Sequence, residues 1–506
     1  MANAVSAFID DPAAGRGGAR VAIATRDGAT TYRDLLGLVG RAGNVLRGLG
    51  VEPEQRVAIL LPDGVEWVAT FFGAVRIGAV AVPLNTRLPP AEWVVLLRDS
   101  RARVLVAEPT LLGALQSALS EVPHLRAIVA TGAGAGTLDG LLAAADPVCA
   151  PEAVSSDDMA FWLYTSGTTG GPKAVVHLHR DLLAGRHYGI DVLQIGDEDR
   201  ILATSRLFFA YALGNALLIP FYAGARTYLD PAWPEPQAVA DALREFAPTL
   251  FFSVPTFYGR LLRAGLPADA FRSTRACVSA GERLPAELYT AWRERFGVEI
   301  LDGLGATETI FMVLSNRPGR SRPGSAGMPV PGSEVRLLDP DGRAVGDDEP
   351  GVLHVRTPSL SPAYWNRLDA SRRAFVGEWF RTGDVMTRDA DGFFQHVGRD
   401  DDLFKVAGMW VAPSEVEAVL LAHPGVAEAA VVGVPAEGGL LKPVAFVIGR
   451  GGDEPEALAE ALTAHVEAKL PPHQRPRRIA VVDELPRTVT GKLQRYVLRE
   501  WAERTL

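Results

Sequence analysis

The chain has 506 residues, of which 48% are hydrophobic and 22% charged, and its formal net charge is −9. These values are typical of a globular protein long enough for two or more domains. The acidic balance excludes sequence-independent nucleic-acid binding, which needs a basic face. Lysine is rare, so each lysine within a motif is worth inspecting; the lysines are Lys173, Lys405, Lys442, Lys469 and Lys492.

The cysteines and the N-terminal segment define the expected compartment. Cys149 and Cys277 have no CxxC or metal-ligand spacing, so we expect neither a disulfide framework nor a structural zinc site. The first residues are partly acidic and lack a basic segment followed by an apolar one, so no signal peptide is evident and we expect a cytoplasmic protein. Residues 207–225 carry no charge, but glycines and a proline interrupt them, so we interpret them as buried core around a ligand pocket.

The first two-thirds of the chain alternate apolar runs with segments of helical periodicity. This alternation predicts an α/β fold with largely parallel sheets. The predicted helices are Thr31–Leu49, Trp67–Ile77, Pro236–Phe246 and Pro285–Phe296. The predicted strands are Val57–Leu61, Ala79–Pro83, Ala102–Ala107, Ala127–Ala130, Met159–Leu163, Arg226–Leu229 and Thr249–Val254, and Val175–His179 continues as a strand or enters a helix.

In the last third of the chain the apolar runs are shorter and the pattern of predicted elements changes. Residues 324–398 contain short strands between Gly/Asp turns and predict a β-rich subdomain. A charged junction follows at 399–402, and beyond it the pattern is α+β. The helices expected there are Pro413–Ala422 and Ala457–Lys469, and the strands are Val426–Val434, Val444–Ile448 and Arg478–Val482. We therefore predict a large domain over 1–398, a hinge at 399–402 and a small C-terminal domain over 403–506.

A run of glycines and hydroxyl residues lies between Tyr164 and Ala174, with the sequence YTSGTTGGPKA. Glycines let the backbone bend closely around a ligand, hydroxyls donate hydrogen bonds, and Lys173 adds a positive charge, so the run predicts a cradle for nucleotide phosphates. Pro172 precedes the lysine, where a Walker A loop has glycine, so a P-loop NTPase is not expected. A flexible surface loop is the simpler alternative for this run taken alone.

Four further motifs follow in chain order. In DGLGATET (302–309), Thr307 can bond a phosphate and Glu308 can hold Mg²⁺. In WFRTGD (379–384), Asp384 can accept the ribose hydroxyls. The others are GRDDDLFKVAGMWVAPSEVE (398–417) and LPRTVTGKLQR (485–495), in which Lys492 follows a glycine. Each motif alone is explained equally well as a turn, a capped helix or a solvated charge run.

All five motifs together, in this order, resemble the adenylate-forming superfamily of acyl- and aryl-CoA synthetases, nonribosomal peptide synthetase adenylation domains and luciferases. The resemblance covers nearly the whole chain. It implies that a carboxylate attacks the α-phosphate of ATP to give an acyl-adenylate and pyrophosphate. The small C-terminal domain then swings, and a thiol attacks the adenylate. The cofactors implied are ATP, Mg²⁺ and CoA.

The resemblance also implies a role for individual residues. Lys492, Thr307 and Glu308 are the catalytic residues implied, Glu308 also holds the metal, and Asp401 is the hinge. The ATP-binding residues implied are Thr165, Ser166, Gly167, Thr168, Thr169, Lys173, Asp302, Gly303, Asp384 and Arg399. The CoA-binding residues implied are Arg87, Lys405, Gly408 and Arg475, although solvated surface arginines explain Arg87 and Arg475 almost equally well.

The segment SRLFFAYALGNALL (205–218) looks most like the benzoate-CoA ligase branch, and VSAGE (278–282) agrees with it. The acyl-pocket residues implied are Phe208, Ala210, Tyr211, Ser279, Ala280, Gly281, Gly303, Gly305, Ile310 and Phe311. Core packing is the alternative role for the aromatic residues among them. Phe311 stands where this branch often has histidine, which predicts a substituted benzoate or an arylacrylate as substrate. Ala174 replaces a usual glycine, and we expect little effect.

Three function hypotheses remain open at this point. The first is an aryl-CoA ligase, and the second is a stand-alone adenylation enzyme that loads an aryl acid onto the phosphopantetheine of a carrier protein. A third class couples the adenylate to an amine or another nucleophile. We expect no nucleic-acid or membrane partner, and a homodimer is among the oligomeric states that the sequence leaves open. His177 and His179 are interpreted as packing or hydrogen-bonding residues, since the attacking carboxylate is already ionised.

Overall fold

The computed structural model describes residues 3–165, 171–406, 409–435, 441–451, 454–487 and 493–505. The chain divides into two compact units. Unit 1 comprises Met1–Val335, Val355–Arg381 and Gly392–Phe394, and unit 2 comprises Arg336–His354, Thr382–Asp391 and Gln395–Leu506. The hinge at 399–402 stays a prediction.

Unit 1 contains a six-stranded sheet built from residues 56–178, in the order β6-β5-β3-β4-β7-β8. All neighbours in it are parallel except β7 and β8, which pair antiparallel. Short apolar runs without alternation make these strands, as expected for a sheet that is covered on both faces. Their bounds are β3 Arg56–Leu60, β4 Val80–Pro83, β5 Val104–Ala107, β6 Ala127–Ala130, β7 Met159–Thr165 and β8 Lys173–Leu178.

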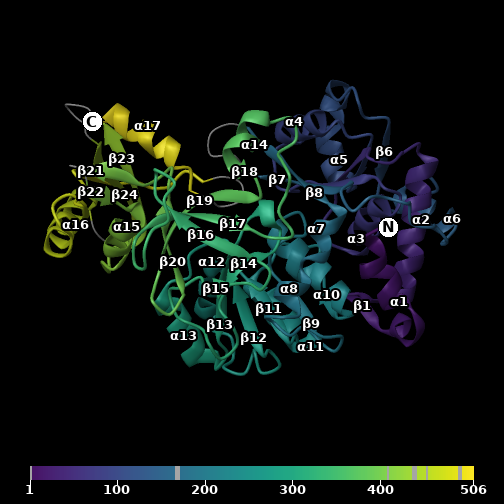
Figure 1. Ribbon diagram of the computed structural model, residues 1–506, viewed down its shortest axis with the longest axis horizontal. Helices are drawn as coiled ribbons and strands as arrows, with labels where there is room; N and C mark the ends of the chain where they lie inside the picture. The colour runs from purple at the N-terminus through teal and green to yellow at the C-terminus, as the bar shows by residue number, and fades with distance from the viewer. Residues whose placement is uncertain are drawn as a thin grey trace. The chain divides into compact units, whose positions relative to one another are not determined.

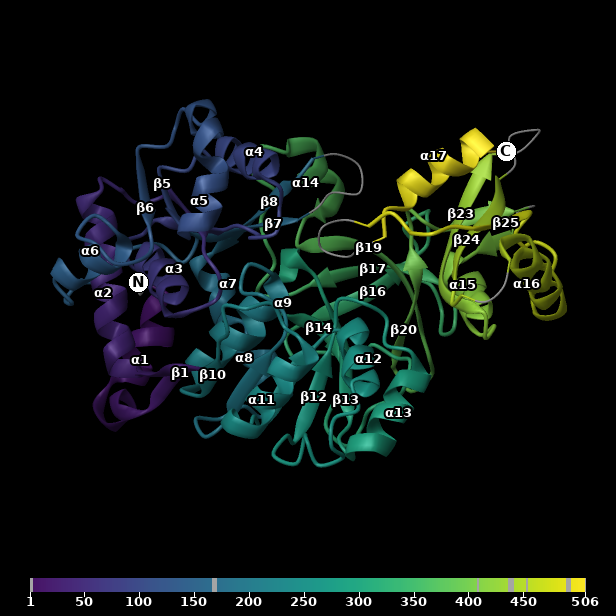
Figure 2. The same cartoon turned by 180° about the vertical axis from the view of Figure 1, so that it is seen from behind.

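A nine-stranded sheet of unit 1 combines the first two strands of the chain with later ones, in the order β15-β14-β13-β12-β11-β9-β10-β1-β2. Its centre is parallel, and antiparallel strands close both edges. Figure 2 shows β12, β13 and β14 in this sheet. The bounds are β1 Val21–Thr25, β2 Gly28–Thr31, β9 Arg200–Ala203, β10 Arg226–Tyr228, β11 Leu250–Ser253, β12 Ala276–Ser279, β13 Ile300–Gly305, β14 Met312–Ser315 and β15 Met328–Pro329.

The longest helix of unit 1 shows how the sequence sets a helix start. Thr31 lies at the N-cap of α2, and its side chain accepts a hydrogen bond from the backbone N–H of Asp34 at 3.2 Å. The helices of unit 1 are η1 Ser6–Asp10, α1 Asp11–Ala13, η2 Gly15–Ala19, α2 Tyr32–Gly48, α3 Val65–Arg76, α4 Pro90–Ser100, α5 Pro109–Leu115, η3 Gln116–Glu121, α6 Leu138–Ala144, α7 His179–Leu183, α8 Arg186–Gly189, α9 Ala210–Ala212, η4 Leu213–Leu218, α10 Ile219–Ala223, α11 Pro236–Phe246, α12 Pro255–Arg263, α13 Ala286–Phe296, η5 Thr307–Thr309 and α14 Leu368–Ala374.

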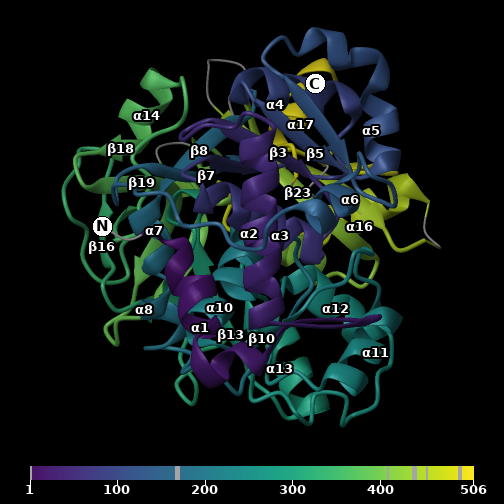
Figure 3. The ribbon, with the colours of Figure 1, turned by 90° about the vertical axis from the view of Figure 1, so that its right-hand side faces the viewer.

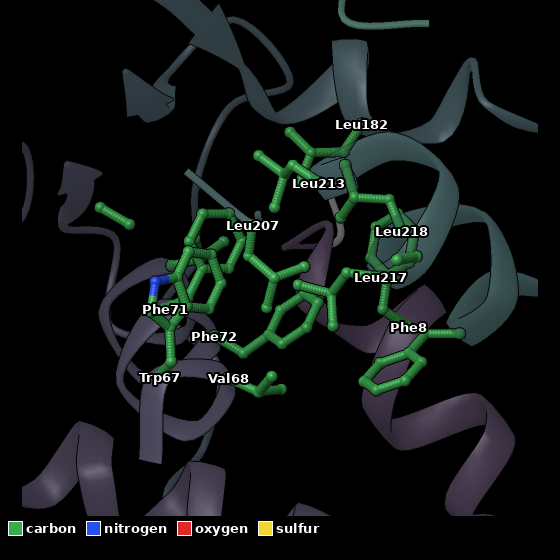
Figure 4. Close-up of a cluster of buried hydrophobic side chains, with 14 of the residues drawn as sticks. Phe8, Trp67, Val68, Phe71, Phe72, Leu182, Leu207, Leu213, Leu217 and Leu218 are labelled. Carbon is green, nitrogen blue, oxygen red and sulfur yellow. The ribbon is translucent and has the colours of Figure 1, made fainter. Parts of the chain in front are cut away.

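Helices and sheets of unit 1 form alternating layers with an apolar core in each interface. The largest core joins α2, α3 and the helices from α7 to α10 to one face of each sheet, and Figure 3 shows α2 beside α3. Its centre is a group of aromatic rings and leucines, including Trp67, Phe71, Phe72 and Leu217 (Figure 4). A second core lies under α4 and α5, and a third under α11, α12 and α13. Both sheets are thereby covered on both faces, which accounts for their apolar strands.

The uncharged segment at 207–225 folds as the short helical stretch α9, η4 and α10 within the largest core. Its side chains from Leu213 to Phe221 are buried against the rest of unit 1. No helix in the described part of the chain is long and apolar enough to cross a membrane. The segment is therefore core, as the sequence predicts.

Five strands form a sheet in the order β16-β17-β19-β18, with β20 paired to β19, in the region predicted to be β-rich. Two further sheets lie within unit 2, the two-stranded sheet β21-β22 and the three-stranded sheet β23-β24-β25. The bounds are β16 Glu334–Leu338, β17 Gly351–Arg356, β18 Phe375–Val376, β19 Trp379–Arg388, β20 Phe394–Arg399, β21 Phe404–Val406, β22 Met409–Val411, β23 Val426–Pro435, β24 Leu441–Gly449 and β25 Arg478–Val481.

Helices cover both faces of the β23-β24-β25 sheet. One apolar core lies between this sheet and α15 and α16, and another lies between the sheet and α17 (Figure 1). The alternation of apolar residues along β23 and β24 supplies one row of side chains to each core. The helices of unit 2 are α15 Pro413–Leu421, α16 Pro455–Lys469 and α17 Arg495–Thr505.

Candidate active site

The predicted phosphate cradle connects β7 to β8 in unit 1. Thr165 ends β7 and Lys173 begins β8, and these two residues are paired across the strands. Ser166, Gly167, Thr168 and Thr169 lie outside the described residues. The Nζ atom of Lys173 lies 5.4 Å from the centroid of the Tyr364 ring. Within the described ranges, no carboxylate forms an ion pair with Lys173, so its charge is available to an anionic ligand.

The DGLG part of the second motif forms the end of strand β13 rather than a loop. Asp302, Gly303 and Gly305 belong to β13, which pairs antiparallel with β14. A Cβ atom on Gly303 would lie 2.8 Å from the carbonyl oxygen of Leu314, and one on Gly305 would lie 2.8 Å from that of Phe311. These glycines are therefore required by the neighbouring strand, which is a structural reason for a motif that the sequence relates to ligand binding.

The turn that follows β13 carries Thr307 and Glu308, and three bonds hold its carbonyl groups. His177 Nε2 lies 2.8 Å from the Thr307 oxygen, the Ser361 N–H donates to the Glu308 oxygen at 2.8 Å, and the Ser359 hydroxyl donates to the Thr309 oxygen at 2.6 Å. The backbone of the turn is thereby fixed from two directions, by β8 and by the segment before α14.

The carboxylate of Glu308 suits a magnesium ion that is shared with phosphates. Its Oε1 accepts a hydrogen bond from the Tyr364 hydroxyl at 2.6 Å, and no residue that the structure describes donates to Oε2. Mg²⁺ is commonly held by one or two carboxylates together with substrate phosphates and water. The described residues contain no cluster of three or more His, Cys, Asp or Glu that would form an all-protein metal site. A half-buried carboxylate with one available oxygen therefore fits the predicted role.

Asp302 is a buried carboxyl group in β13, opposite Ser279 of β12. Burial raises the pKa of Asp302 to about 8. Among the residues described, neither Asp302 Oδ1 nor Ser279 Oγ has a hydrogen-bond partner. The group is therefore held in its neutral form at pH 7 in the folded protein.

We expect Asp302→Asn to remove a pH dependence from the thermal stability. Between pH 3.8 and about 8 the folded protein retains the Asp302 proton whereas the unfolded chain releases it, so the folded state binds more protons and loses stability as pH rises. The melting temperature of the wild type should therefore fall relative to that of Asp302→Asn between pH 5 and pH 8. Asp139→Asn, which changes an exposed carboxylate, is the control. Parallel melting curves for wild type and Asp302→Asn would contradict the assignment.

The predicted acyl pocket gathers at the carboxyl ends of β11, β12 and β13. The Tyr211 hydroxyl donates to the backbone oxygens of Val278 at 2.9 Å and Ser253 at 3.1 Å. Ala210, Tyr211, Ala280, Ile310 and Phe311 belong to or pack against one buried cluster. Ser279 ends β12, and Gly281 follows with φ of +86°, a conformation that favours glycine. Both hydrogen bonds orient the ring of Tyr211.

The turn from Thr309 to Phe311 is strained. Ile310 has φ of +52° and ψ of −42°, and the N–H of Phe311 donates to the oxygen of Thr309 at 2.5 Å, which closes a γ-turn. This conformation is rare for a β-branched residue and costs about 1–3 kcal/mol. The hydrogen bonds to the carbonyl oxygens of Thr307, Glu308 and Thr309 hold the turn in place. The strain sets the direction in which the Phe311 side chain leaves the Glu308 turn.

The ring of Phe311 fills a space that two glycines leave open. A Cβ atom on Gly185 would lie 2.7 Å from Phe311 Cε1 and Cζ, and a Cβ atom on Gly214 would lie 3.1 Å from Phe311 Cδ1. Gly185 precedes α8 and Gly214 lies in η4. The position of this ring therefore depends on two residues that are remote from it in sequence.

The side chains of Phe208 and Arg87 both lie beside the ring of Trp233. The ring of Phe208 lies 6.4 Å from the Trp233 ring, and Arg87 Cζ lies 3.9 Å from the Trp233 centroid. Arg206 approaches the same indole at 5.3 Å and pairs with Asp63 at 3.6 Å, while burial raises the pKa of Asp63 to about 6. A predicted CoA-binding arginine is thus held on an aromatic ring, which leaves the edge of its guanidinium for an anion.

The predicted ribose residues lie together in unit 2. Asp384 Oδ1 lies 3.1 Å from Arg399 Nη1 and 3.3 Å from His396 Nε2. Burial opposes ionisation of Asp384, but the hydrogen bond to His396 and the charge of Arg399 outweigh it, and the pKa of Asp384 is lowered. The carboxylate therefore remains ionised at neutral pH, the form that accepts hydrogen bonds from two hydroxyl groups.

The other predicted residues of unit 2 are more dispersed. Asp401 lies in an exposed turn, and its carbonyl oxygen accepts from Arg499 Nη2 at 3.1 Å. Arg475 donates to the backbone oxygens of Leu470 at 2.9 Å and Glu467 at 2.8 Å, so part of its guanidinium is used at the end of α16. Lys405 is exposed on β21. Lys492 and Gly408 lie outside the described residues.

Comparison with known families decides the relationship that the motifs indicate. The AMP-binding enzyme family matches residues 10–365, and the AMP-binding enzyme C-terminal domain matches residues 415–492. The chain belongs to the AMP-binding enzyme family.

Relatives within the AMP-binding enzyme family span almost the whole chain. The chain is 43% identical to the 4-hydroxybenzoate–CoA/benzoate–CoA ligase of Rhodopseudomonas palustris, with 98% of this chain and 94% of that protein covered. It is 42% identical to the benzoate–CoA ligase of Thauera aromatica, with 96% and 93% covered. A solved anthranilate CoA ligase in complex with anthranoyl-AMP superposes with a TM-score of 0.92 at 39% identity, covering 100% of this chain and 98% of that one. The fold is therefore that of this family.

Some residues of the site were not identified from the sequence. Tyr364 bonds to Glu308, His396 bonds to Asp384, and Trp233 carries Arg87. Gly185 and Gly214 shape the position of Phe311. None of these residues lies next to its partner in the chain, so no local motif identifies it. His177 differs from them, because it adjoins the glycine- and hydroxyl-rich run and was identified from the sequence. The interpretation of His177 as a hydrogen-bonding residue is confirmed.

Proposed function

We propose that the chain is an aryl-acid–CoA ligase that uses ATP to activate an aromatic carboxylic acid and releases AMP and pyrophosphate. The observation that carries this proposal is that the turn after β13 places Glu308 close in the chain to the buried residues Ile310 and Phe311. Glu308, the predicted metal ligand, is followed within three residues by Ile310 and Phe311, which belong to a buried cluster with Ala280. One short segment thus offers a carboxylate for a magnesium–nucleotide complex and an aromatic wall for an acid. The names of three relatives, a 4-hydroxybenzoate–CoA/benzoate–CoA ligase, a benzoate–CoA ligase and a 3-hydroxybenzoate–CoA ligase, support the same reaction.

The proposed reaction has two steps. An oxygen of the substrate carboxylate forms a bond to the α-phosphorus of ATP, and the bond to the pyrophosphate oxygen breaks. The thiolate of CoA then forms a bond to the acyl carbon, and the bond to the AMP oxygen breaks. The substrate acid is already ionised near neutral pH, so the first step needs no general base. The chain must instead orient the two reactants and offset the negative charge that gathers on the phosphates.

Individual residues would supply these effects. Lys173, without an ion-pair partner within the described ranges, and the hydroxyls of Thr165, Ser166, Thr168 and Thr169 would hold the β- and γ-phosphates. Asp384 would accept the ribose hydroxyls, with Arg399 and His396 keeping it ionised. A magnesium ion on Glu308 would neutralise phosphate charge when bound. Lys492 would donate to the α-phosphate, and Arg87, Lys405, Gly408 and Arg475 would serve CoA.

The acid pocket is proposed to favour a substituted or extended aryl acid. Tyr211 presents a ring held by two hydrogen bonds, and Phe311 presents an apolar ring where the resembling branch often has an imidazole. A polar group on the substrate would therefore have no imidazole at position 311 with which to form a hydrogen bond. Turnover of benzoate compared with substituted benzoates and cinnamates tests this selectivity, and a sharp optimum for benzoate would contradict it.

Gly185→Ala is expected to change acid selectivity through Phe311. The backbone of Gly185 has ordinary helical angles, so a new methyl group causes no backbone strain, and its nearest atoms are the Phe311 ring at 2.7 Å and Ile219 Cγ1 at 3.1 Å. Displacement of the ring should lower kcat/KM for large aryl acids about tenfold more than for benzoate, the scale of one methylene in an apolar pocket. Gly113→Ala is the matched control, because a Cβ atom there meets nothing within 4 Å. An unchanged selectivity ratio would disprove the role of this packing.

The proposed function is tested by pyrophosphate release with aryl, arylacrylic and medium-chain fatty acids, with and without CoA. We expect release that requires an aryl acid, increases with CoA and yields an acyl-CoA. Adenylate that CoA cannot discharge would instead favour a carrier protein or another nucleophile as acceptor. Release with fatty acids alone would refute the aryl specificity.

A further inference from the structure

One face of strand β8 supports the catalytic turn of unit 1. Side chains at alternate positions of a strand point to the same face, which places Lys173, Val175 and His177 together. Val175 forms an isolated antiparallel bridge with Tyr364, and His177 Nε2 contacts the Thr307 oxygen at 2.8 Å. The strand that begins with the predicted phosphate-binding lysine thus also carries the contacts to the turn with Glu308.

Tyr364 is fixed beside this strand by backbone hydrogen bonds on both sides. The N–H of Val176 donates to the Ala363 oxygen at 3.2 Å, and the N–H of Trp365 donates to the Ala174 oxygen at 2.9 Å. The ring of Tyr364 also packs against Phe375, with centroids 5.2 Å apart. The backbone and the ring plane are therefore both constrained, and the hydroxyl has a defined direction.

The two ends of this one side chain contact two residues predicted to bind the nucleotide. The hydroxyl donates to Glu308 Oε1 at 2.6 Å, and the ring lies 5.4 Å from Lys173 Nζ. A carboxylate is an acceptor only, so the tyrosine proton lies on this bond and Oε2 keeps its lone pairs for another ligand. The negative face of an aromatic ring attracts an ammonium group without neutralising it. Lys173 is thereby restrained while its charge stays available.

We infer that Tyr364 is a positioning residue that orients Glu308 and Lys173 together toward a magnesium–nucleoside triphosphate. This inference rests on the proposed function and adds to it a residue that no motif identified. In its absence Glu308 would rotate freely about its side-chain bonds, and the entropy lost on binding the metal complex would be greater. Ordering one such side chain on binding weakens the affinity by roughly two- to tenfold.

Tyr364→Phe tests the hydroxyl while it keeps the ring, and Tyr364→Leu removes both. We expect Tyr364→Phe to require roughly two- to tenfold more Mg²⁺ for half-maximal adenylate formation. Binding of Mn²⁺–ATP, measured by electron paramagnetic resonance without any acid, should weaken by a similar factor. Tyr364→Leu should in addition weaken binding of metal-free ATP, because Lys173 loses its ring. Thermal unfolding of each variant shows whether it is folded. If Tyr364→Leu does not fold, the metal dependence of Tyr364→Phe alone tests the inference.

Tyr289→Phe is the matched control, since it removes the hydroxyl of a buried tyrosine that belongs to the core under α11, α12 and α13 and is bonded at 2.8 Å to Ser321. A purely structural role for Tyr364 predicts a lower melting temperature with unchanged metal dependence, as for the control, and that result would overturn the inference. The metal-binding measurement needs no ligase activity. A wild type that binds Mn²⁺–ATP but releases no pyrophosphate would therefore refute the proposed function, while the comparison with Tyr364→Phe would still decide the inference.

Discussion

Replacing Lys492 by alanine is expected to slow acyl-adenylate formation about 10²–10³-fold, the usual cost of removing one donor that stabilises a developing charge. The lysine follows a glycine in the last of the five motifs, and the resemblance implies that its ammonium contacts the α-phosphate during the first step. Negative charge increases there as the carboxylate attacks. The second step breaks the bond between the acyl carbon and AMP, so thioester formation from supplied adenylate should remain largely intact.

The measurement is the rate of pyrophosphate release and, separately, the rate at which synthetic aryl-adenylate and CoA give the thioester. Lys469→Ala serves as the control, because Lys469 is an exposed lysine in the last turn of α16. Equal losses in both half-reactions for Lys492→Ala would show that the lysine is not specific to the first step. The binding of ATP should change little, because the other phosphate contacts are retained.

The pattern of the sequence predicted many of the longer elements of the fold because the relevant signals are local. Apolar runs of four to six residues became the strands of a covered sheet, and β6 at Ala127–Ala130 has the predicted bounds. The helix at Pro236–Phe246 also has the predicted bounds, because a proline at its first turn marks its start. Among the elements that were not predicted are β9, β12, β13, α4, α12 and α17. The glycines of β13 are typical of a turn, and only the antiparallel neighbour β14 makes them residues of a strand.

The sequence supplied candidate site residues only where several functional residues lie close together in one motif. Glu308 and Lys173 lie in motifs, but Tyr364, which contacts both, is 56 residues from Glu308 and lies before α14. Its hydroxyl becomes informative only when β8 and that segment are adjacent. The same holds for Gly185, whose missing side chain matters because Phe311 occupies the space. Contacts of this kind depend on tertiary packing, and a single sequence contains no local signal for them.

Replacing Asp401 by proline is expected to spare the first half-reaction and impair the second. Asp401 lies in the turn in which the N–H groups of Asp402 and Leu403 both donate to the Arg399 oxygen, at 3.0 and 2.9 Å. The resemblance implies that the backbone rotates at this position between the two steps. Proline fixes φ near −65° and restricts the preceding residue, so one of two backbone states becomes costly by about 1–3 kcal/mol.

A penalty of this size corresponds to about 5–150-fold in the balance between two states. Thioester formation from Asp401→Pro should fall by a factor in this range, while acid-dependent pyrophosphate release stays near that of the wild type. Asp401→Ala removes the same carboxylate but leaves φ free, so it should retain both half-reactions. If Asp401→Ala lost thioester formation as fully as the proline variant, the side chain rather than the backbone would be responsible. If Asp401→Pro retained both steps, the hinge would lie elsewhere and the boundary at 399–402 would have to be moved.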